Sequence, residues 1–211
     1  MARPQTEIDA GRERLVDLTM ELIEERGNAG FTVAELAGRA GMSAANLYRF
    51  FENREAVIEA VAERWFSPKI AAVEAVVASD LPPRRKLYEY YARRFVQVRA
   101  LWERDPVLFA TYCEIGNEHF EIVRSYIDLC DHYLGEIIGE AMAEGAFAGL
   151  EIDEALSLIN QAMSTYTNIA VMQHIMPRLS EDKLARIVDA VYDGLSGVDR
   201  GAKSVTGLRA A

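Results

Sequence analysis

The chain of 211 residues has only two cysteines and no long hydrophobic run. Cys113 and Cys130 lie 17 residues apart, which fits neither a CxxC pair nor a zinc finger. We therefore interpret them as free thiols in a reducing cytoplasm. No apolar stretch approaches the roughly 20 residues needed to cross a bilayer. The N-terminus lacks the apolar core of a signal peptide, so we expect a cytoplasmic protein without a membrane partner.

The sequence also lacks the motifs of an enzyme or a metal site. It contains neither a Gly-rich phosphate loop nor a nucleophile elbow. His119, His132 and His174 fall on separate segments, and their spacing from the cysteines matches no usual ligand pattern. We therefore expect no catalytic residues, no metal and no cofactor, and we interpret these groups as partly exposed histidines and buried thiols.

Positive charge is scarce. The chain has 23 Lys and Arg against 33 Asp and Glu, a net charge of −10. Residues 1–66 hold eight arginines and twelve acidic residues, so this part is acidic by itself. A strongly basic domain would have favoured nucleic-acid binding, and that support is absent. Any DNA contact must be local, made by arginines gathered on one surface, while the acidic remainder limits non-specific binding.

What the sequence does contain is a helix-turn-helix pattern over residues 32–55. Thr32 and Glu35 fit a capping box, after which apolar residues repeat at the spacing of one helix face. A short turn follows, Ser43 can cap the next helix, and Asn53 can cap a third. That middle helix is short, which suits insertion into a DNA major groove. Its outward side chains are Ala44, Ala45, Asn46, Tyr48 and Arg49.

These residues resemble the N-terminal domain of the TetR family of bacterial transcriptional regulators. The resemblance covers residues 14–65 and is carried by the Gly41-Met42-Ser43 turn and the segment 47–51, LYRFF. Two positions depart from the family pattern. Arg54 stands where a lysine that contacts the DNA backbone is usual, and Asn28 stands where the family tends to have an aromatic residue. The rest of the chain matches only in being helical and of suitable length.

The periodicity beyond this region is helical, without strand alternation, so we predict an all-α protein of about nine helices. Residues 1–66 are expected to form a three-helix helix-turn-helix domain that binds DNA. Residues 67–198 are expected to form a larger helical domain for effector binding and dimerisation, and residues 199–211 a disordered tail. The pattern also predicts a helix boundary at Pro68 and one unbroken helix over residues 153–175.

The outward residues of the middle helix carry the expected DNA contacts. Asn46 can pair bidentately with adenine and Arg49 with guanine, although Arg49 could instead pair with Glu52 or contact a phosphate. The resemblance favours a phosphate contact by the hydroxyl of Tyr48, which could otherwise pack on Phe51. The complete predicted set is Thr32, Arg39, Ser43, Ala44, Ala45, Asn46, Tyr48, Arg49, Asn53 and Arg54.

Several of these residues have a second interpretation. Thr32 and Arg54 stand at helix N-termini, where free N–H groups favour a phosphate, and Arg54 adds a charge there. Ala44 and Ala45 could touch a thymine methyl group or could simply favour a helix. Arg39 could contact the duplex or complement the dipole of its own helix.

One recognition helix reads only a few base pairs, so specificity calls for a two-fold dimer on a palindromic operator. We assign the dimer interface to the last two predicted helices because each has a wide apolar face. The alternative is that both helices pack within one chain. The predicted interface residues are Leu156, Ile159, Met172, Leu184, Val188, Val191, Tyr192 and Leu195.

The second predicted domain also carries a stripe of aromatic residues and methionines. Such a stripe is more often core than pocket. The resemblance implies a pocket, because family members sense small molecules in this domain. Arg94 is among the polar residues that could orient a ligand, and we expect an apolar or aromatic effector. The predicted effector-binding residues are Tyr91, Phe95, Trp102, Phe109, Tyr112, Phe120, Tyr126, Met163 and Tyr166.

The sequence therefore predicts a dimeric DNA-binding regulator, and the resemblance implies a repressor that an effector releases from its operator. A ligand can alter DNA affinity only by binding two shapes of the dimer unequally. The acidic N-terminal part favours a rival, a helical ligand-binding or interaction protein whose helix-turn-helix does not bind DNA. A helical enzyme would need an acid–base pair or a cofactor motif that the sequence does not show.

Overall fold

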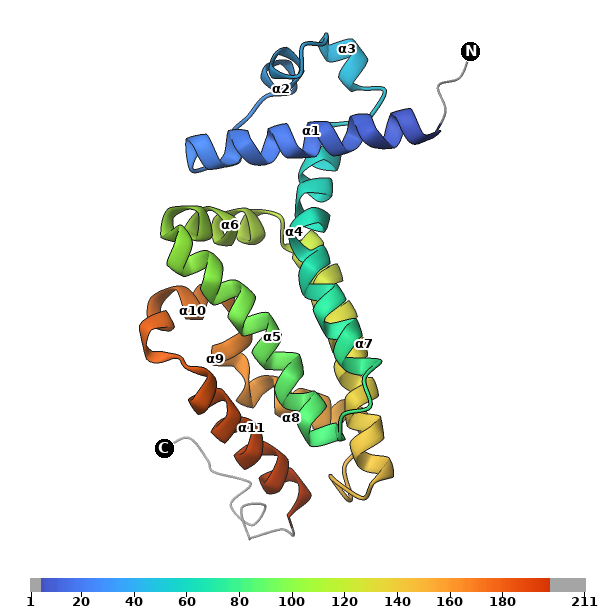
Figure 1. Cartoon of the computed structure of the whole chain (residues 1–211), viewed down its shortest axis with the longest axis vertical. Helices are drawn as coiled ribbons and strands as arrows, with labels where there is room; N and C mark the ends of the chain where they lie inside the picture. The colour runs from blue at the N-terminus through green and yellow to red at the C-terminus, as the bar shows by residue number, and fades with distance from the viewer. Residues whose placement is uncertain (1–4, 198–211) are drawn as a thin grey trace, which may run out of the picture. The chain divides into compact units, whose positions relative to one another are not determined.

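The computed structural model describes residues 5–197. Within that range the chain forms eleven α-helices and one short 3-10 helix, with no strand, which confirms the all-α prediction (Figure 1). The chain divides into two compact units, one of Met1–Ala75 with Arg93–Cys130 and one of Val76–Ala92 with Asp131–Ala211. The expected domain boundary near residue 66 stays a prediction, and the expected tail lies outside the described residues.

The helix-turn-helix elements belong to the first unit. The turn between α2 and α3 uses Gly41 at φ +70°, in the left-handed region that glycine adopts without steric cost. Four core side chains of this bundle have no exposed surface, and burying each stabilises the fold by about 1.5–3 kcal/mol. They are Leu15, Leu36, Leu47 and Val57. The helices are α1 (Gln5–Arg26), α2 (Val33–Arg39), α3 (Ala44–Leu47) and α4 (Arg54–Val77).

The predicted caps of these helices are all present. The Thr32 and Glu35 side chains form the capping box at the start of α2. The Ser43 side chain accepts a hydrogen bond from the backbone N–H of Asn46, at 3.2 Å. Oδ1 of Asn53 accepts from the backbone N–H of Ala56 at 2.7 Å. Each cap satisfies an N–H group that an α-helix leaves without an internal partner.

Helix α4 does not end at Pro68, and the predicted boundary there is wrong. The helix runs from Arg54 to Val77 with Pro68 inside it. A proline in a helix removes one backbone hydrogen bond, to the carbonyl four residues earlier. Core packing outweighs that loss, because Phe66, Val73 and Val76 are buried on either side of the proline.

The segment predicted as one helix over residues 153–175 is broken twice, so that prediction is also wrong. Met163 and Asn168 each end one helix and precede the next. The Asn168 side chain accepts from the backbone N–H of Val171 at 3.2 Å, which caps the third piece. The second unit contains α8 (Ile152–Ala162), α9 (Ser164–Thr167), α10 (Ile169–Ile175), the 3-10 helix η1 (Met176–Arg178) and α11 (Glu181–Ser196).

Three further helices complete the described chain. Asp105 caps α6, and Pro106 occupies its first turn, where a missing N–H costs nothing. Within residues 5–197, no helix has the length and apolar character that a membrane crossing requires. The remaining helices are α5 (Pro83–Arg104), α6 (Pro106–Glu118) and α7 (Phe120–Ala143).

Candidate nucleic-acid interface and the adjoining cavities

The short helix α3 has a buried side and an exposed side. Leu47 is fully buried, and Phe50 and Phe51 also lie in the core. Tyr48, next to Leu47, keeps 53% of its surface exposed, and Arg49 is exposed as well. The buried side chains therefore hold the helix in place while Tyr48 and Arg49 face solvent.

The leading end of α3 is partly engaged within the protein. Ala45 is exposed, whereas Ala44 packs against the bundle core. Nδ2 of Asn46 lies 3.8 Å from Sδ of Met42 and makes a weak hydrogen bond to it. This bond must break before the amide can pair with adenine. Ser43 is occupied as the helix cap.

Arg49 is the predicted contact residue with the most freedom. Within residues 5–197 its side chain forms no ion pair and no hydrogen bond, including the one to Glu52 that the sequence left open. Its guanidinium group is exposed and always charged. These properties suit a side chain that pairs with a base or a phosphate only when DNA is present.

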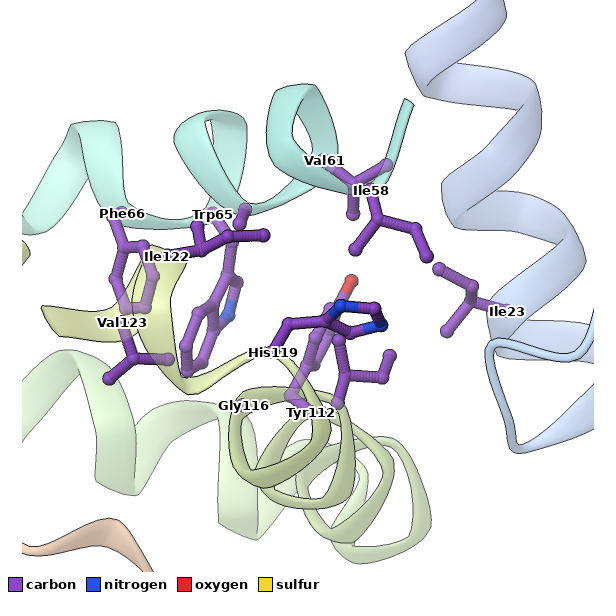
Figure 2. Close-up of a pocket in the computed structure, with 12 residues that line it drawn as sticks. Ile23, Ile58, Val61, Trp65, Phe66, Tyr112, Gly116, His119, Ile122 and Val123 are labelled. Carbon is purple, nitrogen blue, oxygen red and sulfur yellow. The ribbon is translucent and has the colours of Figure 1, made fainter. Parts of the chain in front are cut away.

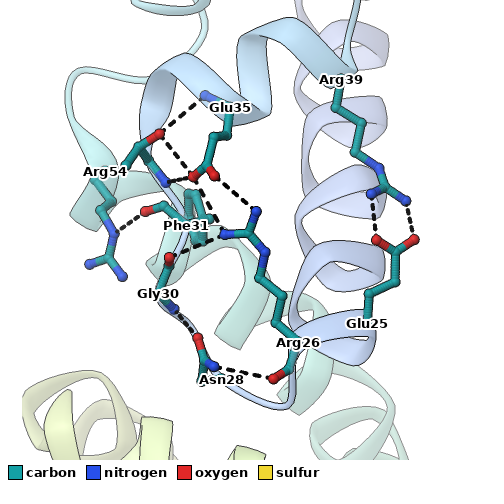
Figure 3. Close-up of polar contacts among 9 residues, drawn as sticks. Glu25, Arg26, Asn28, Gly30, Phe31, Glu35, Arg39 and Arg54 are labelled. Carbon is teal, nitrogen blue, oxygen red and sulfur yellow. Dashed lines mark hydrogen bonds and ion pairs between the residues drawn. The ribbon is translucent and has the colours of Figure 1, made fainter.

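Arg54 faces the protein rather than the solvent. Its Nε donates to the carbonyl of Phe31 at 3.0 Å, and its guanidinium also donates to the carbonyl of Ala29. The group lies 5.0 Å from the centroid of the Phe31 ring. Because these donors are already bonded within the protein, we no longer expect Arg54 to contact a phosphate. They stabilise the loop between α1 and α2 instead, as Figure 3 shows for the bond to the Phe31 carbonyl.

Two other arginines, both on α1, donate hydrogen bonds to backbone carbonyls of the helix-turn-helix. Arg12 donates to the carbonyl of Phe50 at 2.6 Å, just after α3, and lies 4.3 Å from the centroid of the Phe51 ring. Arg14 donates to the carbonyl of Ala40 at 3.2 Å, at the end of α2. The Ala40 carbonyl lies at the C-cap of α2 and has no partner inside that helix, so Arg14 caps α2, whereas Arg12 joins α1 to the segment after α3.

Arg39 is bound to α1 by acidic residues. It pairs with Glu21 at 3.2 Å. It also pairs with both carboxylate oxygens of Glu25 (Figure 3). The hydrogen bond that Arg39 donates to Glu25 is the largest cause that lowers the pKa of Glu25, and the same bond raises the pKa of Arg39. Arg39 lies in the last turn of α2, where its charge also complements the helix dipole, and a phosphate contact would have to compete with the pairing to α1.

The loop before α2 is closed by a polar network that includes Asn28. Its Nδ2 donates to the carbonyl of Arg26 at 3.2 Å, and its Oδ1 accepts from the N–H of Gly30 at 2.8 Å (Figure 3). Glu35 accepts from Arg26 at 2.9 Å and from the backbone N–H of Thr32 at 2.8 Å. The bond from Arg26, followed by those from Thr32, lowers the pKa of Glu35 to about 2. Thr32 is thereby committed to its cap.

An apolar cavity of about 30 Å³ lies in the first unit, lined by residues of α1, α4, α6 and α7 (Figure 2). It has room for about one water molecule. Trp65 and Tyr112 line it and stack with ring centroids 5.0 Å apart. The Thr111 hydroxyl donates to the Gly27 carbonyl at 3.0 Å and so joins α6 to the end of α1. The cavity therefore lies beside a direct link to the helix-turn-helix.

A wider cavity of about 490 Å³ lies between α4 and α7 of the same unit. Its buried surface is formed by Phe66 and Tyr126, whose rings stack at 4.1 Å. Glu59, Glu63 and Glu121 also line it and are exposed. Its volume is within the range of small-molecule sites.

The structure does not bring the predicted effector residues together. Tyr112 lines the small cavity and Tyr126 the wide one. Phe120 is 55% exposed. The stripe is core for the most part, as the first interpretation held, and the cavities instead use Trp65 and Phe66, which the sequence did not single out. The other predicted residues are Trp102, half-buried, Phe95 and Phe109, buried in the first unit, and Tyr91, Met163 and Tyr166, buried in the second.

Half of the predicted dimer residues are buried by the chain itself. Tyr192 is also covered, by the Phe147 ring at 4.9 Å and the Arg84 guanidinium at 4.4 Å. Leu156, Val191 and Leu195 remain half-exposed. The wide apolar faces of these helices pack into the core of the second unit. We therefore no longer expect their buried residues to contact a partner chain. The fully covered residues are Ile159, Met172, Leu184 and Val188.

Other apolar side chains of the second unit are exposed instead. Ile152 and Leu158 of α8 keep 45% and 38% of their surface exposed, and Val171 of α10 keeps 39%. Ile152 belongs to the apolar series that the sequence shows for this helix, whereas Leu158 and Val171 fall outside it. All three are available for contact with a second chain.

Two family profiles match the chain. The one described as bacterial regulatory proteins, tetR family, matches residues 15–61. The one described as tetracyclin repressor-like, C-terminal domain, matches residues 83–188. Together they cover the helix-turn-helix and most of the helices that follow it.

Individual proteins show the same similarity. An uncharacterized HTH-type transcriptional regulator from Xanthobacter autotrophicus is 24% identical over 169 residues, which cover 77% of this chain and 81% of the relative. The fatty acid degradation regulator FadR from Bacillus halodurans superposes with a TM-score of 0.62 at 17% identity, covering 95% of this chain and 99% of that one. Thermus thermophilus FadR, a transcriptional repressor solved with lauroyl-CoA, gives 0.60 at 16% identity, covering 90% and 98%. The structural likenesses show a shared fold.

Proposed function

Because the chain belongs to the TetR family and is a transcriptional regulator by that membership, we propose that it is a repressor that binds a palindromic operator as a dimer. A small apolar or aromatic effector releases it from the DNA. The observation that carries the proposal is the exposed pair Tyr48, the C-cap of α3, and Arg49, in the turn after it, next to the buried side chains of Leu47, Phe50 and Phe51.

Arg49 and Tyr48 have different tasks in this proposal. Arg49 pairs with a guanine in the major groove, an interaction worth about 1–3 kcal/mol of discrimination. The Tyr48 hydroxyl donates to a phosphate and fixes the register of the helix without reading sequence. Ala45 is small and exposed, which lets the helix approach the bases closely.

We propose a palindromic operator because α3 alone is too short to read more than a few base pairs. Its bounds, Ala44–Leu47, leave few side chains that reach base edges. Two copies of the chain, related by a two-fold axis, double the number of base pairs that are read. Ile152, Leu158 and Val171 are exposed apolar residues of the second unit and are proposed as part of the dimer contact.

The effector acts through α6 and α1. A ligand in the wide cavity of about 490 Å³ contacts Phe66, which also lines the small cavity beside Trp65 and Tyr112. A shift of Phe66 toward the small cavity displaces α6, which Thr111 joins to α1 at Gly27. In the dimer this shifts the recognition helices relative to successive major grooves. The lauroyl-CoA bound to Thermus FadR supports an effector with an apolar chain.

A gel-shift experiment tests the proposal. DNA from upstream of the protein's own gene is titrated with the wild type, Tyr48→Ala and Arg49→Ala, with Arg186→Ala as control. Arg186 is an exposed arginine on α11, in an ion pair with Asp182 at 3.0 Å. We expect a shift with the wild type and the control, and at least a tenfold weaker shift with both α3 variants.

Absence of a shift with any genomic DNA would contradict the proposal. It would instead support the rival function, a ligand-binding protein that does not bind DNA. That rival is favoured by the acidic N-terminal part and by the internal contacts of Arg12, Arg14 and Arg54. A ligand that raises the thermal midpoint would then identify its activity.

A further inference from the structure

Lys69 is a buried cation for which the described part of the chain supplies no anion. Its side chain lies on α4, just after Pro68, and the residue is only 7% exposed. Its Nζ donates to the carbonyl of Trp65 at 2.8 Å and lies 3.8 Å from the centroid of that ring. Within residues 5–197 no carboxylate forms an ion pair with it. A buried ammonium without a counter-charge carries a desolvation cost that a carbonyl and an aromatic ring offset only in part.

The other buried lysine of the described chain shows the usual solution to this cost. Lys86, in the second unit, is 5% exposed. Its Nζ pairs with Glu140 at 2.8 Å and also donates to the carbonyl of Val77 at 2.8 Å. A structural lysine in this protein is therefore neutralised by a carboxylate. Lys69 is not, although it is buried to a similar degree.

A second cation lies near Lys69. Burial, and next the positive charge of Arg94 on α5, lower the pKa of Lys69 to about 8. Nε of Arg94 donates to the Tyr126 hydroxyl at 3.2 Å, and Tyr126 stacks on Phe66. The positive charge of Arg94 disfavours the charged form of Lys69, and an anion placed next to Lys69 would favour it.

Neither Lys69 nor Arg94 lines the wide cavity, but Phe66 and Tyr126, which lie next to these two cations, do. Phe66 and Tyr126 form its buried apolar side, and Phe66 also lies beneath Lys69, with Nζ 5.9 Å from its ring centroid. Glu59, Glu63 and Glu121 are exposed, so the acidic groups lie on the solvent side of the cavity. An apolar chain fits against the rings, whereas a large anionic group at the entrance would meet three carboxylates.

We propose that Lys69 and Arg94 bind the carboxylate of an apolar organic acid, whose hydrocarbon part lies against Phe66 and Tyr126. The inference rests on the proposed function, because this acid would be the effector. It favours a free acid over the corresponding coenzyme A thioester, which has no carboxylate at the acyl group and carries phosphates that the three glutamates repel.

Isothermal titration calorimetry of the full chain with octanoate, octanol and octanoyl-CoA tests the ligand class. Octanol has the same chain length without the charge. We expect octanoate to bind at least tenfold more tightly than either of the other two. Equal affinity for octanoate and octanol, tighter binding of the thioester, or no octanoate binding would each overturn the inference.

The variant Lys69→Met tests the residue. It should weaken octanoate binding at least tenfold and leave octanol binding within twofold, with a thermal midpoint equal to or above that of the wild type. The matched control is Lys183→Met, an exposed lysine that also donates to a backbone carbonyl, that of Arg178 at 2.7 Å. An unchanged octanoate affinity in Lys69→Met, or an equal loss in the control, would overturn the assignment.

A measurement on the wild type covers the case in which Lys69→Met does not fold. Octanoate affinity should fall several-fold between pH 7 and pH 9, because Lys69 loses its proton near pH 8, while octanol affinity should not change. A flat octanoate profile would overturn the inference. Operator binding is measured separately by gel shift. Its loss would contradict the proposed function alone, and a failure of octanoate with an intact shift would contradict this inference alone.

Discussion

The arginines of the helix-turn-helix differ in their partners, and this difference separates structural from recognition residues. Arg12, Arg14 and Arg54 donate to backbone carbonyls of their own unit. Arg49 has no such partner among residues 5–197. A cation that holds the loop or a helix end stabilises the fold, and an exposed free cation remains available for a ligand.

Replacing Arg54 or Arg49 by alanine should distinguish an arginine that stabilises the fold from one that binds DNA. Arg54→Ala leaves the carbonyl of Phe31 without its side-chain donor and that of Ala29 with only the N–H of Phe31, so the free energy of unfolding should fall by about 1–2 kcal/mol. Arg49→Ala should change it by less than about 0.5 kcal/mol, as is usual for an exposed residue. Urea denaturation measures both values. A larger loss in Arg49→Ala than in Arg54→Ala would contradict the assignment.

The burial of Lys69 predicts a pH dependence of stability. Its pKa is about 8 in the folded protein, below the ordinary 10.5, so between these values the unfolded chain binds more protons. The stability of the wild type should therefore rise with pH across this window, by about 2 kcal/mol between pH 7.5 and 9.5 relative to Lys69→Met. The comparison cancels the contributions of other groups, such as Cys113, whose pKa burial raises to about 11. Urea melts that show no difference in slope would contradict it.

At the scale of elements, hydrogen bonds between residues close in the sequence were predictable, whereas bonds between distant residues were not. Thr32, Ser43 and Asn53 were identified as caps because each bonds within three residues along the chain. Arg54 bonds to residues 23 and 25 positions away, and no local pattern encodes that. Pro68 was expected to end a helix because local sterics oppose it, yet buried neighbours on both sides keep α4 continuous.

The candidate sites follow the same rule. Tyr48 and Arg49 were predictable because the periodicity of one short helix determines which side chains face outward. The cavities were not, because side chains from α1, α4, α6 and α7 meet only in the folded chain. Lys69 gave no signal at all, since a lone lysine in a sequence indicates an exposed residue.

The link between α6 and α1 makes a prediction about regulation. Thr111→Val removes the hydroxyl that donates to the Gly27 carbonyl and preserves the shape of a residue that is 3% exposed. We expect operator affinity within about threefold of the wild type, but an effector that no longer weakens DNA binding. Fluorescence anisotropy with and without effector measures this coupling. A normal effector response in the variant would show that the coupling takes another route.

At the scale of the whole molecule, the net charge determines how strongly the protein binds DNA of any sequence. The net charge of −10 disfavours random duplex, so binding must depend on a few arginines and helix ends on α3 and its neighbours. Affinity for the operator should then fall by roughly a hundredfold or more between 50 and 200 mM salt. Affinity for random DNA should be too weak to measure at the higher salt. Anisotropy titrations across this range would contradict the account if operator binding were insensitive to salt.

The most direct test of the central claim is the stoichiometry of the complex, measured by analytical ultracentrifugation on a palindromic duplex from upstream of the gene. The account predicts two chains on each duplex for the wild type and no complex at the same concentration for Arg49→Ala. A single chain on the duplex, or a complex that survives in Arg49→Ala with unchanged affinity, would contradict the claim that paired α3 helices recognise the operator.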